Sequence, residues 1–208
     1  RDTDRSRGLG DVYKRQVSCH DDMCLVDRLK ASLPGITPEE LARLDKLAQT
    51  AVFTSQGVPF IYAGEEVMRD KKGIHNSYQS PDSINAIDWR RKTEHADVFA
   101  YYKGLIQLRK NHPAFRLGDA DLVRRHLEFL PVEGSNVVAY HLKENAGGDA
   151  WGDIYVILNS RKEIAKVPVP EGRYTVVCKD GFISEQGLGT IYGPEVFVPA
   201  QSALIFYK

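Results

Sequence analysis

The spacing of apolar residues divides the chain into a helical region followed by a strand-rich region. In the first region, apolar side chains recur every three or four positions, as on one face of an α-helix, at Leu41, Leu44, Leu47, Ala48, Ala51 and Val52. Thr37 suits the N-cap, Pro38 fits the first helical position, and Glu40 can complete a capping box. This pattern predicts an amphipathic helix that ends before Gly57.

A second amphipathic helix precedes Pro113, and strands follow it. The helix is marked by Val98, Tyr101, Tyr102, Leu105 and Leu108 and ends at residues 111–113. Beyond Pro113 the apolar period falls to about 2. Strands are predicted at residues 124–130, 137–143, 154–159, 164–169, 174–178, 196–199 and 203–207. Turn signals rich in Gly, Asn and Asp separate them, so residues 114–208 are predicted to form an antiparallel β-sandwich domain.

Two short apolar segments in the helical region end in polar residues. Residues 17–19 lead into His20, Asp21 and Asp22, and residues 58–63 lead into Gly64-Glu65-Glu66. The second run does not alternate, as expected of a parallel strand covered on both faces. Strand, helix and strand make a βα repeat, and (β/α)8 barrels collect active-site groups at such strand ends. Residues 17–113 are therefore predicted to be the C-terminal portion of a TIM barrel, giving an α/β plus all-β fold class.

A long polar segment follows the second predicted strand. Residues 64–91 far exceed the usual two to six residues of a structural βα loop, and such loops often carry binding residues. The candidate substrate-binding residues in this segment are Asn76, Tyr78, Asn85, Asp88 and Trp89. Aromatic faces with amide and carboxylate neighbours suit a sugar ring. Packing of Tyr78 and Trp89 onto the barrel is the alternative interpretation.

Together these segments resemble type I pullulanases of the α-amylase superfamily, glycoside hydrolase family 13. The His20-Asp21 strand end is similar to the fourth sequence region of that superfamily, and residues 76–89 resemble the pullulanase form of the loop after the eighth strand. The resemblance implies hydrolysis of α-1,6-glucosidic linkages in pullulan, glycogen or limit dextrins with retention. It assigns transition-state stabilisation to Asp21 and anchoring of a sugar hydroxyl to His20. Asp22 stands where the family usually has Asn.

The resemblance also shows which groups are missing from this chain. Retaining hydrolysis needs a nucleophile and a general acid, about 5 to 5.5 Å apart. The family places both upstream of the His-Asp strand, so the chain is interpreted as a C-terminal fragment that is inactive alone. Its expected partners are an α-glucan and the upstream barrel of the same parent. Glu65 and Glu66 are expected to orient loops. The alternatives are an isoamylase-type or neopullulanase-type hydrolase, and a non-catalytic sugar-binding fragment.

Composition narrows the possible partners. Lysine plus arginine number 28 and aspartate plus glutamate 28, which gives no reason to expect nucleic acid. No apolar run approaches the length of a membrane span, so no membrane partner is predicted. Cys19, Cys24 and Cys178 are expected to be free thiols. The histidines lack metal-ligand spacing, and neither a cofactor nor a metal is predicted.

The first residues differ from the rest of the chain. Residues 1–16 contain few apolar side chains and no periodicity, and they resemble a non-native, adapter-derived segment. A basic arm that binds nucleic acid is the alternative. The compartment stays undetermined between the cytoplasm and export from a bacterium. We also expect the sandwich to fold apart from the barrel portion, which would lack strand neighbours.

Overall fold

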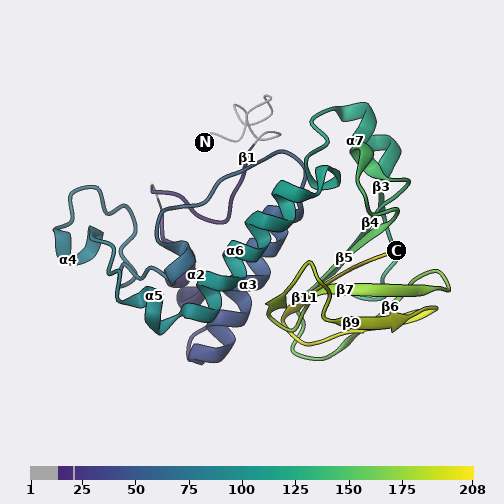
Figure 1. The fold of residues 1–208 in the computed structure, drawn as a ribbon. Coiled ribbons are helices and arrows are strands. Elements are labelled where there is room, and N and C mark those ends of the chain that lie inside the picture. The colour runs from purple at the N-terminus through teal and green to yellow at the C-terminus, as the bar shows by residue number, and fades with distance from the viewer. Residues whose placement is uncertain (1–13, 21) are drawn as a thin grey trace.

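The computed structural model describes residues 14–20 and 22–208, and the remaining residues, including most of the segment interpreted as non-native, lie outside it. The chain forms three layers (Figure 1). Two long helices, α3 (Pro38–Thr54) and α6 (Ala96–Asn111), run side by side and cover one face of a seven-stranded sheet. A two-stranded sheet covers its other face.

The seven-stranded sheet is antiparallel, as the alternating sequence predicts. Its order is β3 (Leu127–Phe129), β4 (Val137–Leu142), β5 (Ile154–Asn159), β11 (Ser202–Tyr207), β7 (Arg173–Lys179) and β8 (Phe182–Ile183), with β9 (Gly189–Tyr192) also paired to β7. The smaller sheet pairs β6 (Ala165–Pro168) with β10 (Glu195–Val198). The predicted sandwich is thus present, although the sequence did not reveal β8 and β9.

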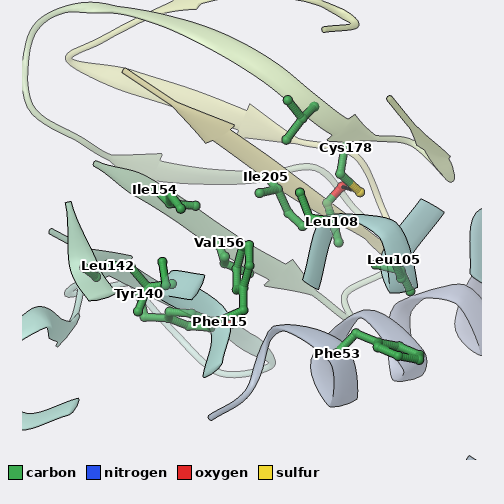
Figure 2. Close-up of a cluster of buried hydrophobic side chains, with 14 of the residues drawn as sticks. Phe53, Leu105, Leu108, Phe115, Tyr140, Leu142, Ile154, Val156, Cys178 and Ile205 are labelled. Atoms are coloured by element: carbon green, nitrogen blue, oxygen red, sulfur yellow. Dashed lines mark hydrogen bonds between the residues drawn. The ribbon is translucent and has the colours of Figure 1, made fainter. Parts of the chain in front are cut away.

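Successive side chains of the central strands point to opposite faces of the sheet and contribute to two separate cores. In β5, Ile154 and Val156 face the helices, whereas Tyr155 and Ile157 face the small sheet. A strand that is covered on both faces can bury every residue, so β5 and β11 read as nearly continuous apolar runs. Figure 2 shows the core on the helical side, where side chains from both helices meet those of the strands.

This helical-side core joins the two regions that the sequence separates at residue 113. Phe53 of α3 and Leu105 and Leu108 of α6 share one buried cluster with strand residues such as Val156 and Ile205. Hydrogen bonds reinforce the contact, because the Tyr101 hydroxyl lies 3.1 Å from the Cys178 sulfur and the Tyr140 hydroxyl donates to the Thr54 carbonyl at 2.9 Å. One face of the sheet therefore shares its core with α3 and α6, while its other face packs on β6 and β10 in a second core. That the sheet domain folds apart stays a prediction.

The helix start predicted at Thr37 is confirmed. Thr37 Oγ1 accepts a hydrogen bond from the Glu40 amide at 3.1 Å, and Pro38 is the first helical residue. The capping box is only half formed, since the Glu40 carboxylate accepts from Gln201 Nε2 at 2.6 Å and pairs with Lys162 at 3.2 Å. The Glu40 carboxylate therefore binds residues of the sheet domain and does not complete the capping box at the start of its own helix.

Several predicted strands are shorter or differently placed. Residues 124–130 do not form one strand, because α7 (Ala120–His126) precedes β3 and is capped by the Asp119 side chain. Residues 58–63 form only β2 (Val58–Pro59). The strand predicted at residues 17–19 is instead β1 (Lys14–Arg15), which pairs in parallel with β2. A closed barrel is not evident in the described residues.

Shorter elements connect these layers. They are α2 (Leu25–Ser32), α4 (Asp82–Asn85), α5 (Arg91–Glu94) and the 3-10 turns η1 (Glu65–Val67), η2 (Pro113–Arg116) and η3 (Ala146–Gly148). Cys24, Val26, Leu41, Met68, Val98 and Tyr102 form a third cluster between α2, α3 and α6. No helix in the described part of the chain is long and apolar enough to cross a membrane.

Candidate functional site

The strand end that carries the His-Asp pair contacts the long polar segment. His20 is exposed, and its Nδ1 lies 3.1 Å from Cys19 Sγ, whereas Asp21 lies outside the described residues. Asp22 accepts hydrogen bonds from its neighbour's amide, Met23 N, at 2.7 Å and from Arg28 of α2. Its Oδ1 also lies 3.2 Å from Nδ1 of His75. The backbone bond and the Arg28 cation lower the pKa of Asp22, so the carboxylate is available to link strand, helix and segment.

Asn85 shapes the segment from within. Its Nδ2 donates to the carbonyls of Ser77 at 2.7 Å and Ser80 at 2.8 Å, and its Oδ1 accepts from Ser77 Oγ at 2.8 Å. These bonds close a loop of residues 74–89, hereafter the aromatic loop, around α4 (Figure 1). Every hydrogen-bonding atom of the Asn85 amide head is used locally, so Asn85 holds the loop's shape.

Asp88 is also engaged within the loop. It accepts two hydrogen bonds from the Arg90 side chain, at 2.8 Å from Nε and 2.7 Å from Nη2, and a third from the Arg90 amide at 3.1 Å. This arginine lowers the pKa of Asp88 to about 2. A fork-to-fork pair of this kind fixes the chain direction next to Trp89.

The two aromatic residues of the loop lie on the surface. Tyr78 is 74% exposed and Trp89 is 61% exposed, and Asn76 is exposed as well. Neither ring belongs to any of the buried clusters. Their exposure alone does not mark a binding surface, because Phe129, Phe182, Tyr192 and Phe197 are exposed to a similar degree.

Glu65 is a buried acid in the 3-10 turn η1, which follows β2. Its carboxylate accepts hydrogen bonds from Ser18 Oγ, from Gln49 Nε2 at 2.9 Å and from the Tyr62 amide at 3.1 Å. Burial raises the pKa of Glu65 to about 7 despite these donors. The contacts tie the segments that follow β1 and β2 to α3.

A second buried acid, Asp45, gives a testable pH dependence. Its Oδ1 accepts from the Tyr102 hydroxyl at 2.8 Å, and burial raises its pKa to about 8. Between pH 4 and 8 the unfolded chain then binds fewer protons than the folded chain, so the free energy of unfolding falls as pH rises, by at most about 1.4 kcal/mol per pH unit. Asp45→Asn stays neutral throughout. We expect its stability relative to wild type to improve from pH 5 to pH 8 in urea unfolding.

The control for this measurement is Glu39→Gln, an exposed acid on the same helix. Its difference from wild type should stay within about 0.5 kcal/mol at both pH values. An Asp45→Asn difference that is equally constant would show that Asp45 is already ionised in the folded chain.

Sequence reasoning missed two cations beneath the aromatic loop. Arg69 and Lys71 are almost fully buried, although lysine and arginine in a polar segment usually indicate solvated positions. Lys71 donates to the Tyr62 hydroxyl and to Ser77 Oγ, at 2.6 Å each. Nothing in the local pattern distinguishes them from exposed Lys72, since only the tertiary contacts bury them.

Comparison with known proteins agrees with this architecture. The family described as "Pullulanase, all-beta domain" matches residues 123–181, from the end of α7 through β7. A pullulanase of Bacillus subtilis (strain 168) is 35% identical over 187 residues, 84% of this chain and 26% of that protein. The structure of a pullulanase from Bacillus acidopullulyticus superposes with a TM-score of 0.90 at 42% identity, covering 94% of this chain and 24% of the other.

A third similar structure is that of a Paenibacillus barengoltzii pullulanase in complex with maltohexaose and α-cyclodextrin. Its TM-score is 0.84 at 37% identity, over 93% of this chain and 29% of that one. The antiparallel sheet domain is thus similar to the all-beta domain of pullulanases. The chain is similar to pullulanases over most of its length. It spans about a quarter of the length of the relatives it matches, 26% for the B. subtilis protein.

Proposed function

We propose that the chain is the C-terminal portion of a debranching enzyme that hydrolyses α-1,6-glucosidic linkages in pullulan, glycogen or limit dextrins with retention. In this proposal residues 17–113 end a (β/α)8 barrel and residues 114–208 form the β-sandwich. The parallel pairing of β1 with β2 supports the barrel, with its first strand beginning at Lys14. Val58 in β2 is 58% exposed, as expected of a strand residue that the upstream barrel would cover.

One observation carries the proposal: Asp22 joins the His20 strand end to the aromatic loop through His75. This contact links the segment after β1 to the start of the aromatic loop and supports assigning both to one glucan-binding region. A pullulanase of similar structure is known in complex with maltohexaose and α-cyclodextrin, and we assign an α-glucan as the ligand of this chain.

The proposed roles follow from the charge that develops during cleavage. The transition state resembles an oxocarbenium ion, and a carboxylate that tightens its hydrogen bonds to the ring stabilises that charge. This is the role proposed for Asp21. His20 would donate a hydrogen bond to a hydroxyl of the same sugar, and Tyr78 and Trp89 would offer their faces to neighbouring rings. The nucleophile and the general acid would come from the upstream barrel of the parent.

The isolated 208-residue chain is expected to bind maltohexaose without hydrolysing pullulan. Neither His20 nor Asp21 can act as both nucleophile and general acid, so no reducing ends should appear above those released by a His20→Ala, Asp21→Ala double variant. Calorimetry should show binding that Tyr78→Ala weakens. Turnover above the double variant would overturn the assignment of the missing groups.

A non-catalytic sugar-binding fragment is the second candidate function. The exposure of Tyr78 and Trp89 favours it, because these rings can contact glucan without the upstream groups. Joining residues 17–208 to the upstream residues of a pullulanase separates the two functions. Debranching activity that depends on His20 and Asp21 supports the enzyme, and binding without turnover in that assembly supports the sugar-binding fragment.

A further inference from the structure

Arg69 and Lys71 each connect residues 62–63, in the segment after β2, to the aromatic loop. In that segment, Lys71 Nζ donates to the Tyr62 hydroxyl at 2.6 Å and Arg69 Nη1 donates to the Ala63 carbonyl at 2.9 Å. On the loop side, Lys71 donates to Ser77 Oγ at 2.6 Å and Arg69 Nη2 to the Asn85 carbonyl. Two cations thus make four cross-links between segments that no strand pairing joins.

Both cations are buried without a carboxylate partner. Lys71 is 2% exposed and Arg69 is 8% exposed, and no ion pair within 4.0 Å involves either side chain among the residues that the structure describes. Their charges instead contact the Tyr62 ring, at 4.9 Å from Lys71 Nζ and 5.0 Å from Arg69 Cζ. A buried charge whose partners are all neutral lowers the free energy of unfolding. We therefore look for a contribution of the two cations other than global stability.

A third contact fixes the backbone between the cations and the loop. Asp27 of α2 accepts hydrogen bonds from the amides of Lys71 and Gly73, at 2.9 Å each. Asp27 thus holds the backbone at Lys71, and the Lys71 ammonium in turn holds the Ser77 hydroxyl. The same hydroxyl donates to Oδ1 of Asn85, so Asn85 is positioned as well.

We propose that Arg69 and Lys71 are positioning residues that preorganise the aromatic loop, so that Tyr78 and Trp89 present their faces to an α-glucan without further ordering. The identity of the ligand rests on the proposed function. The ordering of the loop by the two cations is independent of that function. A loop that is ordered before binding avoids the entropy cost of fixing it in the complex. Removing the constraint should weaken glucan affinity and leave the rest of the fold intact.

The test compares Lys71→Met, Ser77→Ala and the double variant in the 208-residue chain, with Lys72→Met as the matched control. Lys72 is the next residue and is exposed. Amide hydrogen exchange is followed at Ser80, Asn85 and Ala86, whose amides donate to Ser77, Pro81 and Asp82 carbonyls, and in β5 as an internal reference. Calorimetry with maltohexaose measures affinity, and urea unfolding measures global stability.

We expect Lys71→Met to speed exchange at the three loop amides by about tenfold to a hundredfold and to weaken maltohexaose binding by a similar factor. Exchange in β5 should not change, and global stability should stay the same or rise, because a buried unpaired charge is removed. The effects of Lys71→Met and Ser77→Ala should not add, since both break the same link. Lys72→Met should leave every measurement unchanged.

Three results would overturn the proposal. These are loop exchange that Lys71→Met leaves unchanged, loop exchange that rises only in proportion to a fall in global stability, and full additivity of the two substitutions. A wild-type chain that does not bind maltohexaose would contradict the proposed ligand alone. The exchange measurements would still decide whether the two cations order the loop.

Discussion

Replacing Leu105 by alanine is expected to lower the free energy of unfolding by about 3 kcal/mol and to loosen the helices and the sheet together. Leu105 is fully buried in α6, in the cluster that also contains Val156 and Ile205 of the sheet (Figure 2). The cavity left by the substitution would therefore remove contacts on both sides. The strands that line such a cavity are held by their hydrogen-bonded neighbours and do not move in to fill it. The dispersion contacts made by the Leu105 side chain are therefore lost.

Hydrogen exchange measured along the whole chain tests this shared core. Protection should fall in α3 and α6 and also in β5 and β11, and circular dichroism should show a single unfolding transition. Gln107→Ala is the control, because Gln107 is an exposed residue of the same helix. Protection lost in the helices but retained in β5 and β11 would mean that the sheet domain folds apart from residues 17–113.

Asp21→Asn is expected to lower kcat by at least about two orders of magnitude in an enzyme assembled from this segment and the upstream residues of a pullulanase. Asparagine has nearly the same shape but no charge, so it loses the interaction that strengthens in the transition state. KM should change less. His20→Ala should have a milder effect on both kcat and KM, since a hydrogen bond to a sugar hydroxyl is already present in the ground state.

Steady-state rates on pullulan give both constants, and Asp88→Asn serves as the control in the same region. Asp88 is engaged by Arg90 within the loop, so its substitution should act mainly on KM. A kcat near wild type for Asp21→Asn would remove Asp21 from the site. A larger loss for His20→Ala than for Asp21→Asn would mean that the two roles are reversed.

The local sequence predicted the elements whose signals are local. Thr37 and Pro38 start α3 because a hydroxyl cap and a fixed φ act within one turn. The strands β4, β5 and β11 follow from alternating or continuous apolar runs. The prediction was wrong at residues 124–130, where the Asp119 cap extends a helix into residues that also suit a strand.

The candidate site was only partly visible in the sequence. His20 and the aromatic loop were predicted from their motifs, and in the structure Asp22, two residues after His20, lies 3.2 Å from His75 of the loop. The sugar contacts predicted for Asn85 and Asp88 stay predictions, and the structure adds that both side chains hydrogen-bond within the loop. Arg69 and Lys71 were missed altogether, because burial of a cation depends on partners that lie on other segments.

The sequence by itself therefore determined the order and type of the main helices and strands and the family resemblance, and it predicted which residues contact a sugar. Those properties depend on periodicity, caps and motifs, which act over a few residues. Only the tertiary structure decided that the helices and the sheet share one core, that Glu40 binds Gln201 in place of its own helix end, and that buried cations hold the aromatic loop. Each of these depends on contacts between distant segments, whose free energy is set by burial and geometry that no local pattern encodes.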